Sequence, residues 1–541
     1  MELKAILFDT RSIQKYIFSS SRLKMHIGAS YLVDRVFDDV LLPVVRDVCG
    51  QAEIDDVTWR EAPSPDWSEM SQKARVGYIG GGNALILLRP DAGDAAAEIV
   101  RRFSKALLVR CPGLQTGAAI GMVELEADGS WPSAEKSRTS LVLKLKEQQN
   151  TVFPQTTIPY TGLTLTADGT NEAADAYDER KMRYISQGEA AKLRAATTTG
   201  KPAPAEKALH EKLRSVLSDE EEARFMEKAL FPNELDKLGQ KETENYIAVV
   251  HIDGNNMGRK FADLTTLSAY KNKSKEIRTA TIRAFAELVL SMEEAGAYPF
   301  LAQRRDGEDR LYLPVRPLIL GGDDMTFVCA AKVAFDCTEF IMKSLMAKGI
   351  DTCAGVAILP TAYPFFRGYE IAEQLCDSAK GRMRKLANER EGLREEASCW
   401  LDFLRLHGEQ APTLAQIRRQ EYRGALGSLH FGPYRIDGDG SAHYAFKKLR
   451  ALAEGLRKNL PSGKLKDLRA VLQHGEHEAK QYLEQIRHDG YRLPQPAGWE
   501  EYAAHLWQER SGVMRTPFVE AIEMLEFLPP KKVGSEGKEE A

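Results

Sequence analysis

The segment Gly321-Gly322-Asp323-Asp324 places two adjacent carboxylates in a short turn between two apolar runs, residues 317–320 and 325–329. These runs have the composition of strands, and paired glycines supply the positive φ angles that a tight hairpin needs. The turn would therefore present both aspartates at one edge of a sheet. Acidic residues are also common in turns because they hydrogen-bond the local backbone, so this motif alone is equally consistent with an ordinary turn.

A third carboxylate, Asp253, ends the apolar run 246–252 and is followed by turn residues. If this strand lies beside the hairpin, the three aspartates converge as the hard oxygen ligands that Mg²⁺ or Mn²⁺ prefers. Two such ions, about 3.5–4 Å apart, can activate an attacking hydroxyl and stabilise a leaving phosphate. The cluster therefore favours phosphoryl or nucleotidyl transfer. The alternative is that Asp253 caps the helix that follows its strand.

The elements around these aspartates follow the order β-α-β-β-α-β. An amphipathic helix follows residues 246–252, and the hairpin is followed by a second helix, a strand from Thr352 to Leu359 and a helix from Ile371 to Leu386. The apolar residues that define the first two helices are Ile282, Phe285, Val289 and Met292, and Val333, Cys337, Phe340, Ile341 and Leu345. This order predicts a ferredoxin-like unit, the arrangement of polymerase and cyclase palms, in which the first strand and the hairpin share one antiparallel sheet.

A second copy of this pattern stands at the N-terminus. Residues 4–9 form an apolar run that ends on Asp9, and a hairpin follows at Gly80-Gly81-Gly82-Asn83. The interval between residues 9 and 80 is 71 residues, and that between residues 253 and 321 is 68. The chain is therefore predicted to carry two palms, and chance similarity between two α/β units is the alternative. Glycine and asparagine replace the two aspartates in the first hairpin. We expect the first palm to be catalytically silent, serving as structure or as one wall of a nucleotide site.

Four motifs resemble the large subunit of type III CRISPR effector complexes, the CRISPR polymerase family. They are Phe8-Asp-Thr-Arg-Ser-Ile-Gln-Lys-Tyr-Ile17 with Gly28-Ala-Ser-Tyr-Leu32, His251-Ile-Asp-Gly-Asn-Asn-Met-Gly258, Leu320-Gly-Gly-Asp-Asp324 and Gly355-Val-Ala-Ile-Leu-Pro360. Members of that family make cyclic oligoadenylates from ATP when their complex senses foreign RNA. The resemblance implies such a synthase in antiviral defence. It also implies guide and target RNA and other complex subunits as partners.

The resemblance assigns roles in the second palm. Asp253, Asp323 and Asp324 are the implied catalytic, metal-binding carboxylates, with the Gly254 carbonyl as a further ligand of Mg²⁺ or Mn²⁺. The implied nucleotide-binding residues are Gly254, Asn255, Asn256, Gly321, Gly322 and Lys380. In the implied reaction, the ribose hydroxyl of one ATP attacks the α-phosphate of the next, pyrophosphate leaves and the same chemistry closes the ring. For Lys380, a solvated position on a helix is the alternative.

The chain also departs from the family's pattern. It begins on the first strand of the first palm, so we expect no histidine–aspartate nuclease domain, and we interpret His488-Asp489 as a surface pair. The segment Thr157–Leu165 resembles the family's zinc ribbon without its cysteines. Because no Cys-x-x-Cys pair occurs anywhere in the chain, a structural zinc is not expected.

The global composition is that of a multidomain intracellular enzyme. The chain has 541 residues, is 43% hydrophobic and carries a net charge of −4, which argues against a broadly basic nucleic-acid surface. Its seven scattered cysteines favour reduced thiols in the cytoplasm, and we expect no signal peptide, membrane span or membrane partner. Basic patches at Lys380–Lys385 and Arg418-Arg419 are candidate RNA or triphosphate contacts, with solvated helix faces as the alternative. Phosphate-loop, Rossmann and serine-hydrolase motifs are missing.

These patterns predict an α+β chain of two ferredoxin-like palms with a helical insert and a C-terminal helical domain. The predicted boundaries are 1–150 for the first palm, 151–243 for the insert, 244–390 for the second palm, 391–530 for the helical domain and 531–541 for a disordered tail. Predicted helices in the insert are Glu206–Leu217 and Ser218–Leu230, after a flexible tract at Ala195–Ala205. Predicted helices in the C-terminal domain are Trp400–Leu404, Phe446–Leu456, Leu465–Leu472 and Tyr482–Ile486. The resemblance implies that this domain binds a small subunit.

Two other functions stay open from the sequence. One is a non-catalytic RNA-binding scaffold of a CRISPR ribonucleoprotein, and the other is a stand-alone cyclic dinucleotide synthase. Retention of Asp253, Asp323 and Asp324 favours an active enzyme, because a cluster of like charges is unfavourable without a cation.

Overall fold

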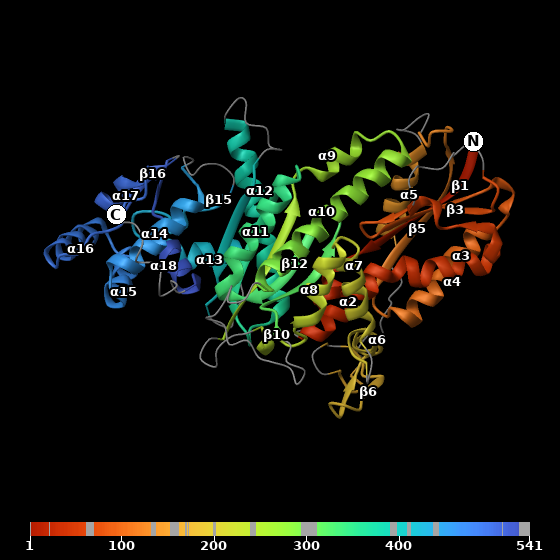
Figure 1. Cartoon of the computed structure of the whole chain (residues 1–541), viewed down its shortest axis with the longest axis horizontal. Helices are drawn as coiled ribbons and strands as arrows, with labels where there is room; N and C mark the ends of the chain where they lie inside the picture. The colour runs from red at the N-terminus through yellow and green to blue at the C-terminus, as the bar shows by residue number, and fades with distance from the viewer. Residues whose placement is uncertain are drawn as a thin grey trace. The chain divides into compact units, whose positions relative to one another are not determined.

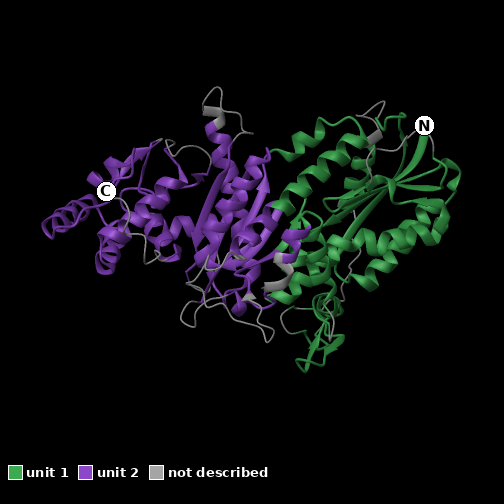
Figure 2. Ribbon diagram, in the orientation of Figure 1, with its two compact units in different colours: residues 1–218, 256–283, 318–323 green, residues 219–255, 284–317, 324–541 purple. Residues whose placement is uncertain are grey.

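The computed structural model shows several sheets and many helices (Figure 1). It describes residues 2–20, 22–60, 70–130, 137–151, 162–167, 170, 172–198, 202–238, 245–293, 311–389, 398–407, 413–436, 443–510 and 512–529. The chain forms two compact units, which are shown in Figure 2. Unit 1 comprises residues 1–218, 256–283 and 318–323, and unit 2 comprises residues 219–255, 284–317 and 324–541.

Unit 1 contains a five-stranded sheet with the order β2-β3-β4-β1-β5, in which β1 is antiparallel to both β4 and β5. The strands are β1 Glu2–Arg11, β2 Ile54–Asp55, β3 Ala74–Gly80, β4 Asn83–Leu88 and β5 Gln115–Glu124, and the helices around them are α1 Ile13–Phe18, α2 Leu23–Arg35, the π-helix Val36–Leu41, α3 Leu42–Cys49, α4 Ala95–Arg110 and α5 Ser137–Thr151. Alternate residues of β1 face opposite sides of this sheet. Phe8 packs on Phe37 and on Phe103 of α4, whereas Leu7 lies in a cluster with Leu141 and Leu145 of α5.

Unit 1 also holds elements from the predicted insert and the segment after Asn256. They are the hairpin β6 Ala176–Asp178 with β7 Arg183–Ile185, the helices α6 Gln187–Ala196, α7 Pro204–Arg214 and α9 Met257–Ala262, and the first part of α10 Leu267–Glu293. A capping box between Ser186 and Glu189 sets the start of α6. The predicted helix Glu206–Leu217 is confirmed as α7.

The sheet of unit 2 has the order β11-β12-β9-β13-β14-β15, with β9 antiparallel to β12 and β13. The strands are β9 Tyr246–Gly254, β11 Val315–Gly321, β12 Asp324–Ala330, β13 Thr352–Pro360, β14 Trp400–Arg405 and β15 Tyr434–Arg435, and the helices that follow β12 and β13 are α11 Ala334–Ala347 and α12 Phe365–Glu389. This confirms the predicted hairpin, the strand from Thr352 and the helix from Ile371. Ile282, Phe285, Val289 and Met292 are all buried, as predicted.

The remaining elements of unit 2 are mostly helices. They are α8 Asp219–Lys228, β8 Ala229–Leu230, β10 Leu311–Tyr312, α13 Leu414–Glu421, α14 Phe446–Asn459, α15 Ser462–Val471, α16 Glu476–His488, α17 Glu500–His505, β16 Gln508–Arg510, β17 Val513–Arg515 and α18 Phe518–Phe527. The predicted helices Phe446–Leu456, Leu465–Leu472 and Tyr482–Ile486 are confirmed as α14, α15 and α16, and Ser218–Leu230 is confirmed as α8 up to Lys228, after which Ala229 and Leu230 form β8.

The predicted helix Trp400–Leu404 is wrong, because these residues form β14, which extends the sheet parallel to β13. A short apolar run fits a buried strand as well as a buried helix, and periodicity cannot separate the two. The region 391–530 is therefore not purely helical. Phe340 is also 36% exposed rather than buried. The predicted tail 531–541 and most of Thr157–Leu165 lie outside the described residues.

The two sheets share local features that the sequence comparison could not show. In each, the third residue after the aspartate near the end of the first strand, Asp9 or Asp253, has a left-handed backbone, Ser12 with φ 51° and Asn256 with φ 56°. Each of these residues precedes a six-residue helix, α1 or α9. Because non-glycine residues rarely adopt this conformation, its recurrence at the same offset supports a structural repeat.

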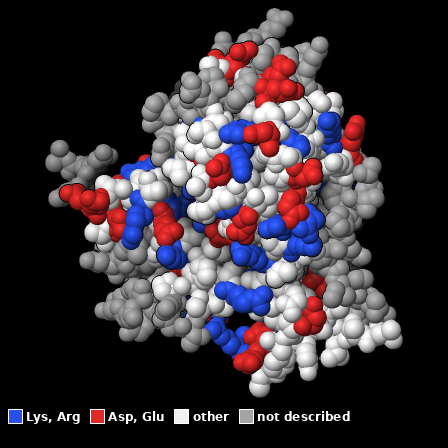
Figure 3. Space-filling model, turned by 90° about the vertical axis from the view of Figure 1, so that its right-hand side faces the viewer, with Lys and Arg blue, Asp and Glu red and all other residues white. Residues whose placement is uncertain are grey.

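The state of the cysteines and the distribution of surface charge agree with what the composition indicates. Among the described helices, none has both the length and the apolar character needed to cross a membrane. All seven cysteines are buried and unbridged. On the face shown in Figure 3, basic and acidic side chains lie interspersed, in keeping with the small net charge.

Candidate functional site

Strand register brings Asp253 and Asp324 to one edge of the unit 2 sheet. Ile252 of β9 pairs with Met325 of β12, so that the next residues outward, Asp253 near the end of β9 and Asp324 at the start of β12, are neighbours. Both side chains are about one-third exposed, at 31% and 30%. The predicted convergence of these two carboxylates is therefore seen, and Asp323 is their neighbour in the turn.

The turn that carries Asp323 uses one glycine rather than two for its backbone shape. Gly322 has φ 63°, whereas Gly321 ends β11 without a positive φ. This corrects the expectation that both glycines supply left-handed conformations. A two-residue hairpin turn with glycine at its first central position needs positive φ at that position alone. An added Cβ at Gly321 would also meet no atom within 4 Å, so neither strain nor crowding requires glycine there.

Lys380 of α12 forms an ion pair with Asp253, to which it donates a hydrogen bond. Its side chain is 15% exposed, so it is not a solvated lysine on a helix face. Burial alone would lower the pKa of the Lys380 ammonium, but the charge of Asp253 and the hydrogen bond to it outweigh burial, and the pKa is raised. A permanent positive charge therefore lies at this edge of the sheet.

His251 is a site residue that sequence reasoning missed. It lies two residues before Asp253, on the same face of β9, and its Nδ1 is 3.3 Å from Asp324 Oδ1 and 3.1 Å from Thr326 Oγ1. Burial lowers the pKa of His251 to about 4, so the imidazole is neutral near pH 7. The period-two spacing from Asp253 was the signal that could have identified it.

This buried imidazole makes stability depend on pH. Its pKa is about 6.5 in an unfolded chain and about 4 here, so unfolding takes up a proton between these values. The free energy of unfolding is therefore expected to fall as the pH is lowered from 6.5 to 4. A His251→Asn variant keeps an amide nitrogen near the position of Nδ1 but cannot titrate. Urea unfolding at pH 7 and pH 5 should show a smaller loss for this variant; an equal loss would contradict the assignment.

Three predicted nucleotide-binding residues lie at the end of β9. Gly254 pairs with Thr352. Asn255 is 1% exposed, its backbone N–H donates to the Asp351 carbonyl at 2.9 Å and its side-chain amide donates to the Ser398 carbonyl at 3.0 Å. Asn256 precedes α9 in a left-handed conformation. The structure thus gives Asn255 a structural role, and nucleotide contacts by Gly254 and Asn256 remain predictions.

The corresponding position in unit 1 has an asparagine in the hairpin and an amide beside its aspartate. Asp9 pairs with Asn83 and Gly117, and Gln149 of α5 donates to Asp9 Oδ2 at 2.6 Å. Burial raises the pKa of Asp9, although the Gln149 hydrogen bond and Arg11 act in the opposite direction. Beside them lies a cavity of about 250 Å³, which is lined mainly by apolar side chains of β1, β4, α5 and the start of α10. The neutral Gln149 amide therefore contacts Asp9, whereas the charged Lys380 ammonium contacts Asp253.

The donor set at Asp253 and Asp324 fits a divalent cation. Carboxylate oxygens are the ligands that Mg²⁺ and Mn²⁺ prefer. The side chains are partly exposed, and the Lys380 ammonium already balances one of these charges. Asp253, Asp324, the adjoining Asp323 and the Gly254 carbonyl are the groups that would hold the ions.

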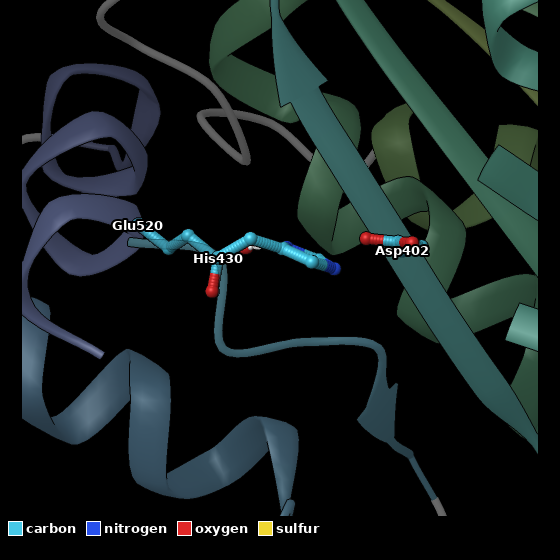
Figure 4. Close-up of side chains that lie close together, drawn as sticks. All are labelled: Asp402, His430 and Glu520. Atoms are coloured by element: carbon cyan, nitrogen blue, oxygen red, sulfur yellow. Dashed lines mark hydrogen bonds and ion pairs between the residues drawn. The ribbon is translucent and has the colours of Figure 1, made fainter. Parts of the chain in front are cut away.

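A second cluster in unit 2, Asp402, His430 and Glu520, also has the composition of a metal site (Figure 4). Its oxygens, however, already accept hydrogen bonds. Asp402 accepts from Phe403 N at 3.0 Å and from Arg418 Nη2 at 2.6 Å. Glu520 accepts from His430 Nδ1, the amides of residues 431 and 432 and the Tyr434 hydroxyl, at 2.5–3.1 Å. We therefore interpret it as a buried structural network.

One residue that contacts this network, Arg418, is also a predicted contact residue. Arg418, a candidate for RNA or triphosphate contact, is 20% exposed and is held by the fully buried Asp402. The pairing gives Arg418 a structural role, and its contact with RNA or triphosphate stays a prediction. His488, by contrast, is 91% exposed, which confirms His488-Asp489 as a surface pair.

Comparison with known proteins shows likeness at the level of structure. No family model matches the sequence, and no curated protein matches it. A chain of the crystal structure of the Csm1-Csm4 cassette in complex with pppApApA is similar, with a TM-score of 0.51, 13% identity and coverage of 98% of this chain and 70% of that chain. For the cassette in complex with one ATP, the TM-score is 0.51 and the identity 13%, and the match covers 97% of this chain and 70% of that chain. For the Csm1-Csm4 subcomplex of the type III-A CRISPR-Csm interference complex, the TM-score is 0.50 and the identity 13%, and the match covers 97% of this chain and 70% of that chain. The chain therefore has a fold seen in these Csm1-Csm4 structures.

Proposed function

We propose that this protein is a nucleotidyltransferase that makes cyclic oligoadenylate from ATP in a type III CRISPR defence system. The observation that carries the proposal is the meeting of Asp253, Asp324 and Lys380 at one sheet edge, with Asp323 beside them. The fold shared with the Csm1-Csm4 structures, two of which contain ATP or pppApApA, supports the choice of substrate and product class.

In this proposal, each side chain has a distinct task. Asp253, Asp323 and Asp324 hold the cations, which when bound would activate the attacking ribose hydroxyl and stabilise the leaving pyrophosphate. Lys380 offers a positive charge to the triphosphate. His251 fixes the orientation of Asp324 by its contact at 3.3 Å.

The two sheets are proposed to be the two palms. They share the strand order given by β-α-β-β-α-β connections, and both have a left-handed residue at the same offset after the aspartate. In the first palm, the Gln149 amide replaces the ammonium of Lys380, and Asn83 stands at the hairpin where the second palm has Asp324. We propose that the first palm does not bind a cation and that the partners are RNA and further complex subunits, including one like Csm4.

The product assay tests this function. Purified protein, alone and then with guide RNA, target RNA and partner subunits, is incubated with each nucleoside triphosphate and Mg²⁺ or Mn²⁺. We expect pyrophosphate release and cyclic oligoadenylates with ATP, identified by mass spectrometry. A cyclic dinucleotide product would instead favour a stand-alone dinucleotide synthase. Intact RNA binding with no pyrophosphate under any condition would leave a scaffold.

A further inference from the structure

Two side chains from different helices, one largely buried and one fully buried, bond the Gly321–Asp324 turn. Lys212 Nζ of α7 donates to the Leu320 carbonyl at 3.0 Å, and Thr281 Oγ1 of α10 donates to the Gly322 carbonyl at 2.8 Å. These carbonyls flank Gly321, and all four residues belong to unit 1. The turn that carries the candidate catalytic carboxylates is thus bonded from two sides.

Lys212 has an environment that a lysine on a surface helix would not have. Its side chain is 14% exposed, and its ammonium also pairs with Asp34 of α2 at 3.0 Å. Burial lowers its pKa, with Asp34 acting in the opposite direction. Because lysine is rarely buried without partners, these two contacts account for its position. β11 lies at one end of the strand order of its sheet. The Leu320 carbonyl, near the end of β11, is bonded by the Lys212 side chain from the insert.

Thr281 also departs from the usual behaviour of threonine within a helix. A threonine hydroxyl there commonly bonds the carbonyl four residues earlier, as Thr338 does to Ala334 at 2.7 Å. Thr281 is 1% exposed and directs its hydroxyl to Gly322 instead. Two residues further along α10, Arg283 Nη1 donates to the Val216 carbonyl at 2.8 Å and so connects α10 to the residues that follow α7.

The hairpin of the first sheet is held differently. The Gly82 carbonyl accepts from the Thr10 amide at 2.8 Å, and the Gly81 carbonyl accepts from the Asn83 side chain at 3.1 Å. Both bonds come from residues of the strands that border that hairpin. Among the described residues, the hydrogen bonds from α7 and α10 are thus made to the Gly321–Asp324 turn, whereas these two bonds of the first hairpin come from its own sheet.

We propose that Lys212 and Thr281 are positioning residues that clamp the Gly321–Asp324 turn, so that the insert helix α7 sets the placement of Asp323 and Asp324. The effect on catalysis rests on the proposed function, whereas the clamp itself is a structural claim. Since a displacement of about 1 Å at a reacting centre can cost about a hundredfold in rate, loosening the turn would lower turnover without touching the substrate.

The test uses full-length Lys212→Met and Thr281→Val variants, which keep side-chain size and remove each donor. Lys207→Met on α7, a 73% exposed lysine, and Thr279→Val on α10, an exposed threonine, are the matched controls. We expect amide hydrogen exchange at residues 320–324 to rise about tenfold or more in the test variants and to stay unchanged in the controls. Unchanged exchange in both test variants would overturn the clamp, whether or not the protein makes a product.

Steady-state kinetics then tests the consequence for the reaction. With ATP, kcat should fall about tenfold in each test variant while KM stays within about twofold, because neither residue contacts the substrate. The double variant should lose less than the product of the single effects, since both donors hold the same turn. A raised KM with unchanged kcat would overturn the positioning role. A wild-type protein without activity would reject the proposed function and leave the exchange result to decide the clamp.

Discussion

An Asp323→Ala/Asp324→Ala double variant is expected to release pyrophosphate from ATP at least about 10³-fold more slowly than the wild type, a loss of about 4 kcal/mol in transition-state stabilisation. The reason is the donor set at the sheet edge. Asp324 begins β12 beside Asp253, and removal of it and Asp323 leaves one carboxylate where two cations need several. Pyrophosphate release and mass spectrometry of the products measure the effect.

The fold should survive this double substitution. Both side chains lie at the outer end of a hairpin, and Asp324 is 30% exposed, so neither fills a core. The melting temperature should therefore stay close to that of the wild type, while Mn²⁺ binding measured by calorimetry is lost. A variant that keeps Mn²⁺ affinity but loses activity would contradict the ligand role of these carboxylates.

Asp9→Ala is the matched control, because Asp9 holds the position in β1 that Asp253 holds in β9. Its carboxylate accepts a hydrogen bond from the neutral Gln149 amide, whereas Asp253 pairs with the Lys380 ammonium. Activity should change by less than about tenfold. A loss as large as that of the double variant would show that the first palm takes part in the chemistry.

Local sequence signals were sufficient to predict the strands and the hairpin. Apolar runs that end on Asp9 and Asp253, together with the glycine-rich turns, carry both the element type and the position. The convergence of Asp253 with Asp324 could be predicted because an antiparallel register follows from the hairpin and its neighbouring strand. Lys380 was predicted by family resemblance, and its pairing with Asp253 rests on the packing of α12 across β13.

Residues whose role depends on long-range contacts could not be predicted. The apolar run Trp400–Leu404 reads equally well as helix or strand, and its pairing with β13 decides the outcome. Lys212 lies in a charged segment with the pattern of a solvated helix, and only the tertiary fold brings it to the Leu320 carbonyl. For His251, the period-two spacing places it on the same face of β9 as Asp253, but its contact with Asp324 depends on the pairing of β9 with β12.

Replacing Gly355 by alanine is expected to lower the free energy of unfolding by about 3 kcal/mol or more, because β13 and α12 are in backbone contact there. A Cβ at this position would fall on the Ala372 carbonyl oxygen, and it would lie 2.6 Å from the Cys376 amide nitrogen. Neither atom can rotate away as a side chain could. Chemical denaturation monitored by circular dichroism measures the loss.

The same substitution should also reach the site, because α12 must move off the sheet to accept the new methyl group, and α12 carries Lys380 towards Asp253. Gly381→Ala, on the same helix, is the matched control. It adds a methyl group where no atom lies within 4 Å, so the better helix propensity of alanine should stabilise the protein by up to about 1 kcal/mol. Equal stability of the two variants would mean that α12 does not pack on β13 at Gly355, and the placement of Lys380 beside Asp253 would then lose its structural basis.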